Sequence, residues 1–181
     1  LLRRLKADGV TPLVGVDRRP PQQRLDGVTY IQADVRDLSG LEIDGDIDTI
    51  FNLAAVHVTP GHPDPEYYDT NIAGATQVTA FARRRGIETI VFTSSISVYG
   101  PGEETKSEAS PPAPESAYGW SKWLAEGIHR AWMQEDGGRR LVIARPAVIF
   151  GPGEGGNFTR LAKLMKKGFF VYPGRQDTIK A

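Results

Sequence analysis

The sequence predicts an α/β fold, in which a doubly wound parallel sheet carries helices on both faces. Two observations support this prediction. Short apolar runs recur along the chain, as is typical of strands buried on both faces, and stretches with helical periodicity separate them. The runs expected to form strands are 12–17, 28–32, 49–53, 89–93 and 141–145.

The helical stretches are identified by their periodicity and their ends. Apolar residues at helical spacing predict a helix over about 65–85, and Gly86 fits a cap at its C-terminus. The same pattern predicts a second long helix over about 117–134, which a glycine pair follows. A third, shorter helix is expected over about 157–167.

Length, charge and cysteine content limit the function classes. The 181 residues fit one domain, and 22 basic against 22 acidic side chains give zero net charge. This balance argues against a nucleic-acid binder. The absence of cysteine excludes a disulfide scaffold, a thiolate nucleophile and a Cys-ligated metal site. No apolar run approaches the roughly 20 residues of a membrane helix, so no membrane partner is expected.

Tyr118 and Lys122 are the first candidates for chemistry. They lie four residues apart near the start of a predicted helix and therefore share one helix face. A cation beside a phenol is expected to lower the tyrosine pKa from about 10 toward neutrality, which gives a usable general base. Because the chain has six tyrosines, the spacing alone leaves a chance pair open.

Polar side chains follow two predicted strands at the end where open α/β sheets bind ligands. Ser94 and Ser95 follow the fourth strand, and Asp17 ends the first. A carboxylate at that position can accept the ribose hydroxyls of an adenine dinucleotide. The adjacent Arg18 and Arg19 could instead hold a 2′-phosphate. A serine-rich turn and a solvated turn aspartate stay open as structural alternatives.

Two further segments follow strands. Asp34 and Val35 come after the second strand, and Leu53, Ala54 and Ala55 come at the end of the third. Small residues there allow the backbone to approach a ligand closely. An aspartate after a strand is also a common turn former.

Taken in order, these segments resemble the extended short-chain dehydrogenase/reductases, in their NAD-dependent epimerase/dehydratase family. The resemblance covers almost the whole chain and implies a Rossmann-like fold, with 1–150 as an NAD(P)-binding domain and 151–181 as the start of a substrate-binding region. The segments that carry it are Asp17, Asp34-Val35, Asn52-Leu53-Ala54-Ala55, Asn71-Ile72-Ala73-Gly74, Ser94-Ser95 ahead of Val98-Tyr99-Gly100, Tyr118-Gly119-Trp120-Ser121-Lys122, and Arg145-Pro146 ahead of Gly151-Pro152-Gly153.

The resemblance implies a role for each matching residue. Tyr118 is expected to be the catalytic acid/base, with Lys122 as its pKa partner and ligand of the nicotinamide ribose. Ser95 is expected to orient the reacting oxygen, Asp17 to hold the adenosine ribose, and Asn157 to contact the diphosphate of the substrate. The remaining cofactor-binding positions implied are Arg18, Asp34, Val35, Leu53, Ala54, Ala55, Asn71, Thr93, Ser94 and Pro146.

One family feature lies outside the sequence. The family opens with a strand and a Gly-rich turn whose amides hold the pyrophosphate, and this chain begins inside the helix that follows. The fold is therefore expected to be incomplete at both ends, with the central first strand absent. We expect the 181 residues alone neither to fold fully nor to bind a dinucleotide tightly.

The segment after Ser95 separates the family's reactions. Ile96 and Ser97 stand where the sugar dehydratases carry acidic residues, and neither side chain can do acid–base work. Chemistry that needs only Ser, Tyr, Lys and cofactor remains, which favours a nucleotide-sugar epimerase that removes and returns a hydride at a sugar carbinol carbon. The alternative is an NAD(P)-dependent oxidoreductase on a non-sugar substrate, which Val148 favours because galactose-type epimerases have Asn there.

Cofactor and partners follow from the same resemblance. Asp17 favours NAD, and the two arginines after it keep NADP as the less favoured alternative. His57 and His62 lack a third ligand at suitable spacing, so no metal is expected. The resemblance further implies a cytoplasmic enzyme that forms a homodimer through its two long helices.

Overall fold

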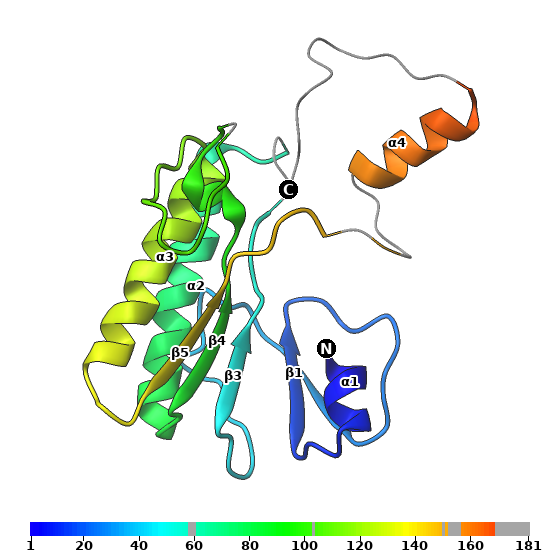
Figure 1. The fold of residues 1–181 in the computed structure, drawn as a ribbon. Coiled ribbons are helices and arrows are strands. Elements are labelled where there is room, and N and C mark those ends of the chain that lie inside the picture. Colours follow the sequence, from blue (N-terminus) through cyan, green and yellow to red (C-terminus); the bar gives the residue numbers. More distant parts are fainter. Residues whose placement is uncertain (58–60, 103, 150, 152–156, 169–181) are drawn as a thin grey trace.

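The computed structural model describes residues 1–57, 61–102, 104–149, 151 and 157–168 (Figure 1). The five predicted strands and the three predicted helices are confirmed, each within one residue of the expected bounds, while a 3₁₀ helix, η1, was not predicted. In chain order the elements are α1 (Leu2–Ala7), β1 (Leu13–Asp17), β2 (Val28–Gln32), β3 (Thr49–Asn52), α2 (Asp64–Arg85), β4 (Thr89–Thr93), η1 (Ile96–Tyr99), α3 (Ala117–Gln134), β5 (Arg140–Ala144) and α4 (Asn157–Lys166).

The strands are parallel, as expected, but they form two sheets. β1 pairs with β2, and β3, β4 and β5 form a second sheet in that order. In the described part of the chain no ladder joins β1 to β3. The predicted fold class is thus confirmed. The single sheet that it implied is divided into two between β1 and β3.

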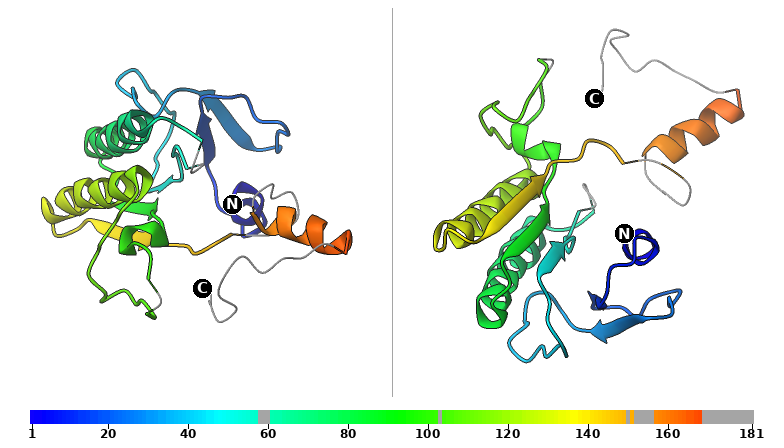
Figure 2. Two further views of the ribbon diagram at one scale, coloured as in Figure 1. Left: turned by 90° about the horizontal axis from the view of Figure 1, so that it is seen from above. Right: turned by 60° about the horizontal axis from the view of Figure 1, so that its bottom comes forward.

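Helices α2 and α3 lie side by side on one face of the three-stranded sheet (Figures 1 and 2). Ile90 and Phe92 of β4 are fully buried beneath them. Val91, between these two residues, points to the opposite face of the sheet. Its neighbours on that face, Phe51 of β3 and Val142 of β5, are 38% and 53% exposed. None of the helices in the described ranges combines the length and apolar character that crossing a bilayer requires.

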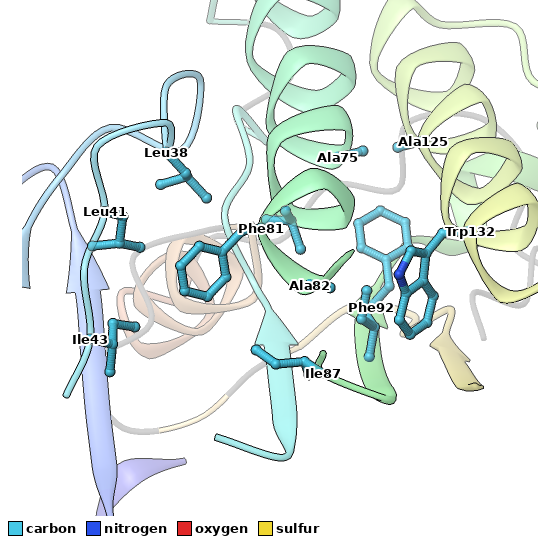
Figure 3. Packing of buried hydrophobic residues seen from close by; sticks show 12 residues of the cluster. Leu38, Leu41, Ile43, Ala75, Phe81, Ala82, Ile87, Phe92, Ala125 and Trp132 are labelled. Atoms are coloured by element: carbon cyan, nitrogen blue, oxygen red, sulfur yellow. The ribbon is translucent and has the colours of Figure 1, made fainter. Parts of the chain in front are cut away.

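The hydrophobic core joins the two sheets. Leu38, Leu41 and Ile43, from the segment between β2 and β3, pack into the same cluster as the side chains of α2, and Trp132 of α3 closes it on the other side (Figure 3). Gly86 ends α2 in a left-handed conformation, which turns the chain back into β4.

We expect Trp132→Ala to lower the free energy of unfolding by about 3–5 kcal/mol, because it opens a cavity where a fully buried indole now packs. Chemical denaturation of the intact protein measures this change. The control is Val10→Ala, at a side chain that is 46% exposed; we expect less than about 1 kcal/mol. Equal losses in the two variants would contradict the assignment of Trp132 to the core.

Candidate active site

The start of α3 places a tyrosine against the serine segment that follows β4. The hydroxyl of Ser116 caps the helix by accepting a hydrogen bond from the Gly119 amide at 3.0 Å. A Cβ atom on Gly119 would lie 2.6 Å from the Ser97 carbonyl oxygen, so only glycine permits this approach of α3 to η1. The approach brings the Tyr118 phenol close enough to the Ser95 hydroxyl for the two groups to interact.

Backbone hydrogen bonds fix the serine segment itself. Thr93 is the last residue of β4, and the Ser94 amide then donates to the Ala144 carbonyl at 2.7 Å. The Ile96 amide donates to the Pro146 carbonyl at 3.2 Å. The ends of β4 and β5 therefore stay paired just beyond the sheet, at the edge where ligands bind in this class of fold.

The pKa of Tyr118 is opposite in direction to the sequence prediction. Burial raises it above the usual value, and the interaction with Ser95 offsets only part of this effect. The expected lowering by Lys122 is not seen, because the Lys122 ammonium lies over the Phe92 ring, 4.3 Å from its centroid. The phenol is therefore protonated at neutral pH in this structure.

Lys122 is buried, with 2% of its surface exposed. Burial lowers its pKa to about 8, and the negative charge of Glu126 on the same helix face counteracts part of this effect. The ring of Phe92 supplies a cation–π contact. Lys122 thus remains mostly charged at pH 7 without contact to bulk water.

His129 also packs against Phe92, and it was not predicted from the sequence. Its ring stacks on Phe92 with centroids 4.2 Å apart. Nδ1 lies 2.7 Å from the Ala125 carbonyl and donates to it, so Nε2 accepts from the Asn52 amide at 3.2 Å. Burial, with a smaller contribution from the charge of Lys122, lowers the pKa of His129 to about 4, so the ring is neutral at pH 7.

Asn71 of α2 connects the end of β3 to α3. Its side chain accepts from the Val56 amide at 2.9 Å and donates to the Val56 carbonyl at 3.2 Å and to the Ser121 hydroxyl at 2.8 Å. Ser121 in turn donates to the Tyr118 carbonyl at 2.8 Å. This buried amide thus holds the tyrosine helix against the segment after β3, and its predicted contact with a cofactor stays a prediction.

Asp17 and Asp34 lie at the carboxyl ends of β1 and β2, which are neighbours. Asp17 is exposed, and its Oδ1 accepts from the Arg19 amide at 2.8 Å. Asp34 is engaged by Arg36, whose side chain donates to both carboxylate oxygens at 3.0 and 2.7 Å. Hydrogen bonds from the side chain and the backbone of Arg36 lower the pKa of Asp34 to about 2.

The segment after β3 is open to a ligand. Leu53 is 54% exposed, Ala54 is exposed and Ala55 is half-buried. Val35 packs against Gly74 of α2, where an added Cβ would lie 3.0 Å from the valine Cγ1 atom. Arg18 is exposed and its carbonyl accepts a hydrogen bond from Gln32. Asn157 begins α4, and its side chain lies outside the described residues.

His57 and His62 lie between β3 and α2. His62 lies 2.7 Å from the carboxylate of Glu66 one helical turn later. In the ranges that the structure describes, no group of three or more His, Cys, Asp or Glu side chains could hold a metal ion.

We expect the free energy of unfolding to decrease as the pH falls from 6.5 to 4, because the unfolded chain binds a proton at His129 that the folded protein excludes. The full effect is roughly 3 kcal/mol. Urea denaturation at several pH values measures it. His129→Gln should flatten the slope in this window, whereas His62→Gln, at a partly exposed ring, should not. An unchanged slope in His129→Gln would sink the idea.

Comparisons with known proteins agree with the motifs. The chain is 38% identical over 151 residues to N-acetyl-alpha-D-glucosaminyl-diphospho-ditrans,octacis-undecaprenol 4-epimerase of Escherichia coli O157:H7, which covers 82% of this chain and 45% of that protein. MoeE5 in complex with UDP-glucuronic acid and NAD is similar with a TM-score of 0.73 and 30% identity, over 90% of this chain and 56% of that one. UDP-glucuronic acid 4-epimerase from Bacillus cereus in complex with NAD gives a TM-score of 0.75 at 25% identity, over 92% and 59%.

These coverages mean that the chain spans about half the length of the relatives it matches. The sequence model of the NAD dependent epimerase/dehydratase family matches residues 1–169. The chain therefore belongs to the NAD-dependent epimerase/dehydratase family, as its strand-end motifs and the segment from Tyr118 to Lys122 predicted.

Proposed function

We propose that the protein is an NAD-dependent nucleotide-sugar epimerase that inverts a carbinol carbon of the sugar. The observation that carries the proposal is the approach of α3 to η1 at Gly119, which sets Tyr118 beside Ser95 beyond the end of β4, with the buried Lys122 one helical turn further along α3. Ile96 and Ser97 add no acid or base to this set. The relative from Escherichia coli and the Bacillus cereus enzyme are both named as 4-epimerases, which supports the same reaction.

Each of the three side chains has a separate task. Tyr118 accepts the proton of the sugar hydroxyl and returns it after inversion. Ser95 donates a hydrogen bond to the reacting oxygen and so orients it beside the phenol. Lys122 supplies positive charge in a site of low polarity. When bound, NAD provides the acceptor for the hydride, and its oxidised ring carries a positive charge that favours the phenolate.

The carboxyl ends of the strands fit a dinucleotide. The exposed carboxylate of Asp17 suits the ribose hydroxyls of the adenosine half. Leu53 and Ala54 present an exposed, uncharged surface after β3. Asp34 is less free to take part, because Arg36 occupies its carboxylate.

The substrate class is a sugar carried on a diphosphate. MoeE5 was solved with UDP-glucuronic acid, and this supports a nucleotide sugar. A second candidate is a sugar on a polyprenyl diphosphate, because the relative that shares 38% identity is named for such a substrate. The diphosphate is common to both, so a panel containing UDP-sugars and undecaprenyl-diphosphate sugars separates them.

We also propose a cytoplasmic homodimer that associates through its two long helices. Trp120 and Leu124 support this, since both are 44% exposed and lie one turn apart on the outer face of α3.

The full-length protein, purified without added cofactor, is expected to carry stoichiometric NAD, because an epimerase regenerates its cofactor in place and has no need to release it. Denaturation followed by mass spectrometry identifies the dinucleotide. An empty protein, or one that carries NADP, would instead indicate a reductase that exchanges its cofactor at every turnover.

We expect Tyr118→Phe to lower kcat by at least about a hundredfold while NAD stays bound, because only the phenolic oxygen is lost. Epimerisation assays on the diphosphate-sugar panel, together with the bound-NAD stoichiometry, measure both effects. Tyr68→Phe, which removes a phenolic oxygen from α2, is the matched control and should keep its activity. Full activity in Tyr118→Phe would refute the mechanism.

A further inference from the structure

Glu126 is a fully buried carboxylate on the helix that carries the candidate catalytic residues. Arg145, just after β5, binds this carboxylate through a fork of two hydrogen bonds, in which Nε donates to Oε1 at 2.8 Å and Nη2 donates to Oε2 at 2.6 Å. Arg130, whose side chain is 46% exposed, reaches Oε2 from the surface at 3.3 Å. Such a fork fixes direction as well as distance, so the end of β5 is tied to one place on α3.

The same arginine extends this connection to the serine segment. Its Nη1 donates to the Tyr99 hydroxyl at 2.6 Å. Tyr99 ends η1, and Ser95 is the residue that caps the start of η1. Glu126 is therefore linked through Arg145 to the short helix that begins at Ser95. The Ser94 hydroxyl, at the start of the same segment, is buried and has no hydrogen-bond partner among the described residues.

Glu126 also follows Lys122 by one helical turn, on the same face of α3. The titratable groups around Lys122 on its own helix are Tyr118, Glu126 and His129. β4 contributes only the neutral Phe92 ring there, α2 contributes Tyr67 against Tyr118, and the end of β5 contributes Arg145, which is paired with Glu126. Among these described groups, Glu126 is the one negative charge.

We propose that Glu126 is a positioning residue with two tasks: it is the counter-charge of the buried Lys122 ammonium, and through Arg145 it holds the serine segment in register with α3. It touches neither the proposed substrate nor the cofactor. The inference rests on the proposed function only for its kinetic part, because the charge of Lys122 can be measured without any substrate.

The decisive experiment follows the ¹³Cε signal of Lys122 against pH in the intact protein labelled with ¹³C-lysine, assigned with Lys122→Met. In Glu126→Gln the midpoint of this titration should move to lower pH by about one unit or more, because an opposite charge nearby is lost. The control is Glu135→Gln, the same substitution at the exposed end of α3, where the glutamate is also held in a fork by an arginine, Arg83. It should leave the midpoint unchanged.

The kinetic measurement uses the same variants. In Glu126→Gln the alkaline limb of the kcat profile should move with the Lys122 midpoint, so that kcat at pH 8 falls roughly fivefold for a shift of about one pH unit. A loss of kcat at every pH, with the Lys122 midpoint unchanged, would mean a merely structural role and would overturn the proposal. If the Lys122 midpoint shifts but the protein epimerises no substrate, the role of Glu126 as counter-charge is supported. That result would count against the proposed function alone.

A second variant covers the case in which Glu126→Gln fails to fold because Arg145 is left buried and unpaired. Glu126→Gln with Arg145→Met removes both charges together. Its Lys122 midpoint should again lie at lower pH than in the unsubstituted protein. An unshifted midpoint in this double variant would overturn the proposal in the same way.

Discussion

A lysine ammonium and a glutamate carboxylate are both costly to remove from water, and α3 buries one of each on the same helix face. Lys122 is 2% exposed and Glu126 not at all. The cost is offset by the Arg145 fork on the carboxylate and by the Phe92 ring under the ammonium. As a result, the positions of α3, η1 and the end of β5 depend on one another. The contact between Ser95 and Tyr118 is set by this same group of elements.

The fold was predictable because strands buried on both faces leave a strong local signal. The apolar run over 89–93 and the glycine after α2 fix that part of the sheet without any long-range information. The 3₁₀ helix after Ser95 has no comparable signal, since it depends on the Ser95 cap and on contact with α3. The division into two sheets could not be predicted from the sequence either, because the pairing of strands depends on the whole folded chain and not on any one segment.

The candidate site was predictable only where its residues share a local segment. The spacing of Tyr118 and Lys122 placed them on one helix face, and the resemblance added Ser95. The direction of the Tyr118 pKa was predicted wrongly, since spacing does not show that the lysine turns toward Phe92. Glu126 was missed, although its position four residues after Lys122 is the one signal that could have found it.

β1 and β3 each have one edge without a ladder partner among the described residues. The amides and carbonyls along such edges are templates for another extended chain. Val16 and Phe51 on these strands are 40% and 38% exposed, which adds apolar surface to the hydrogen-bonding groups. A single extended segment that paired with both edges at once would turn two small sheets into one continuous sheet. Without such a segment, these same edges are where molecules of this chain would adhere to each other, so handling it at high concentration invites self-association through strand addition.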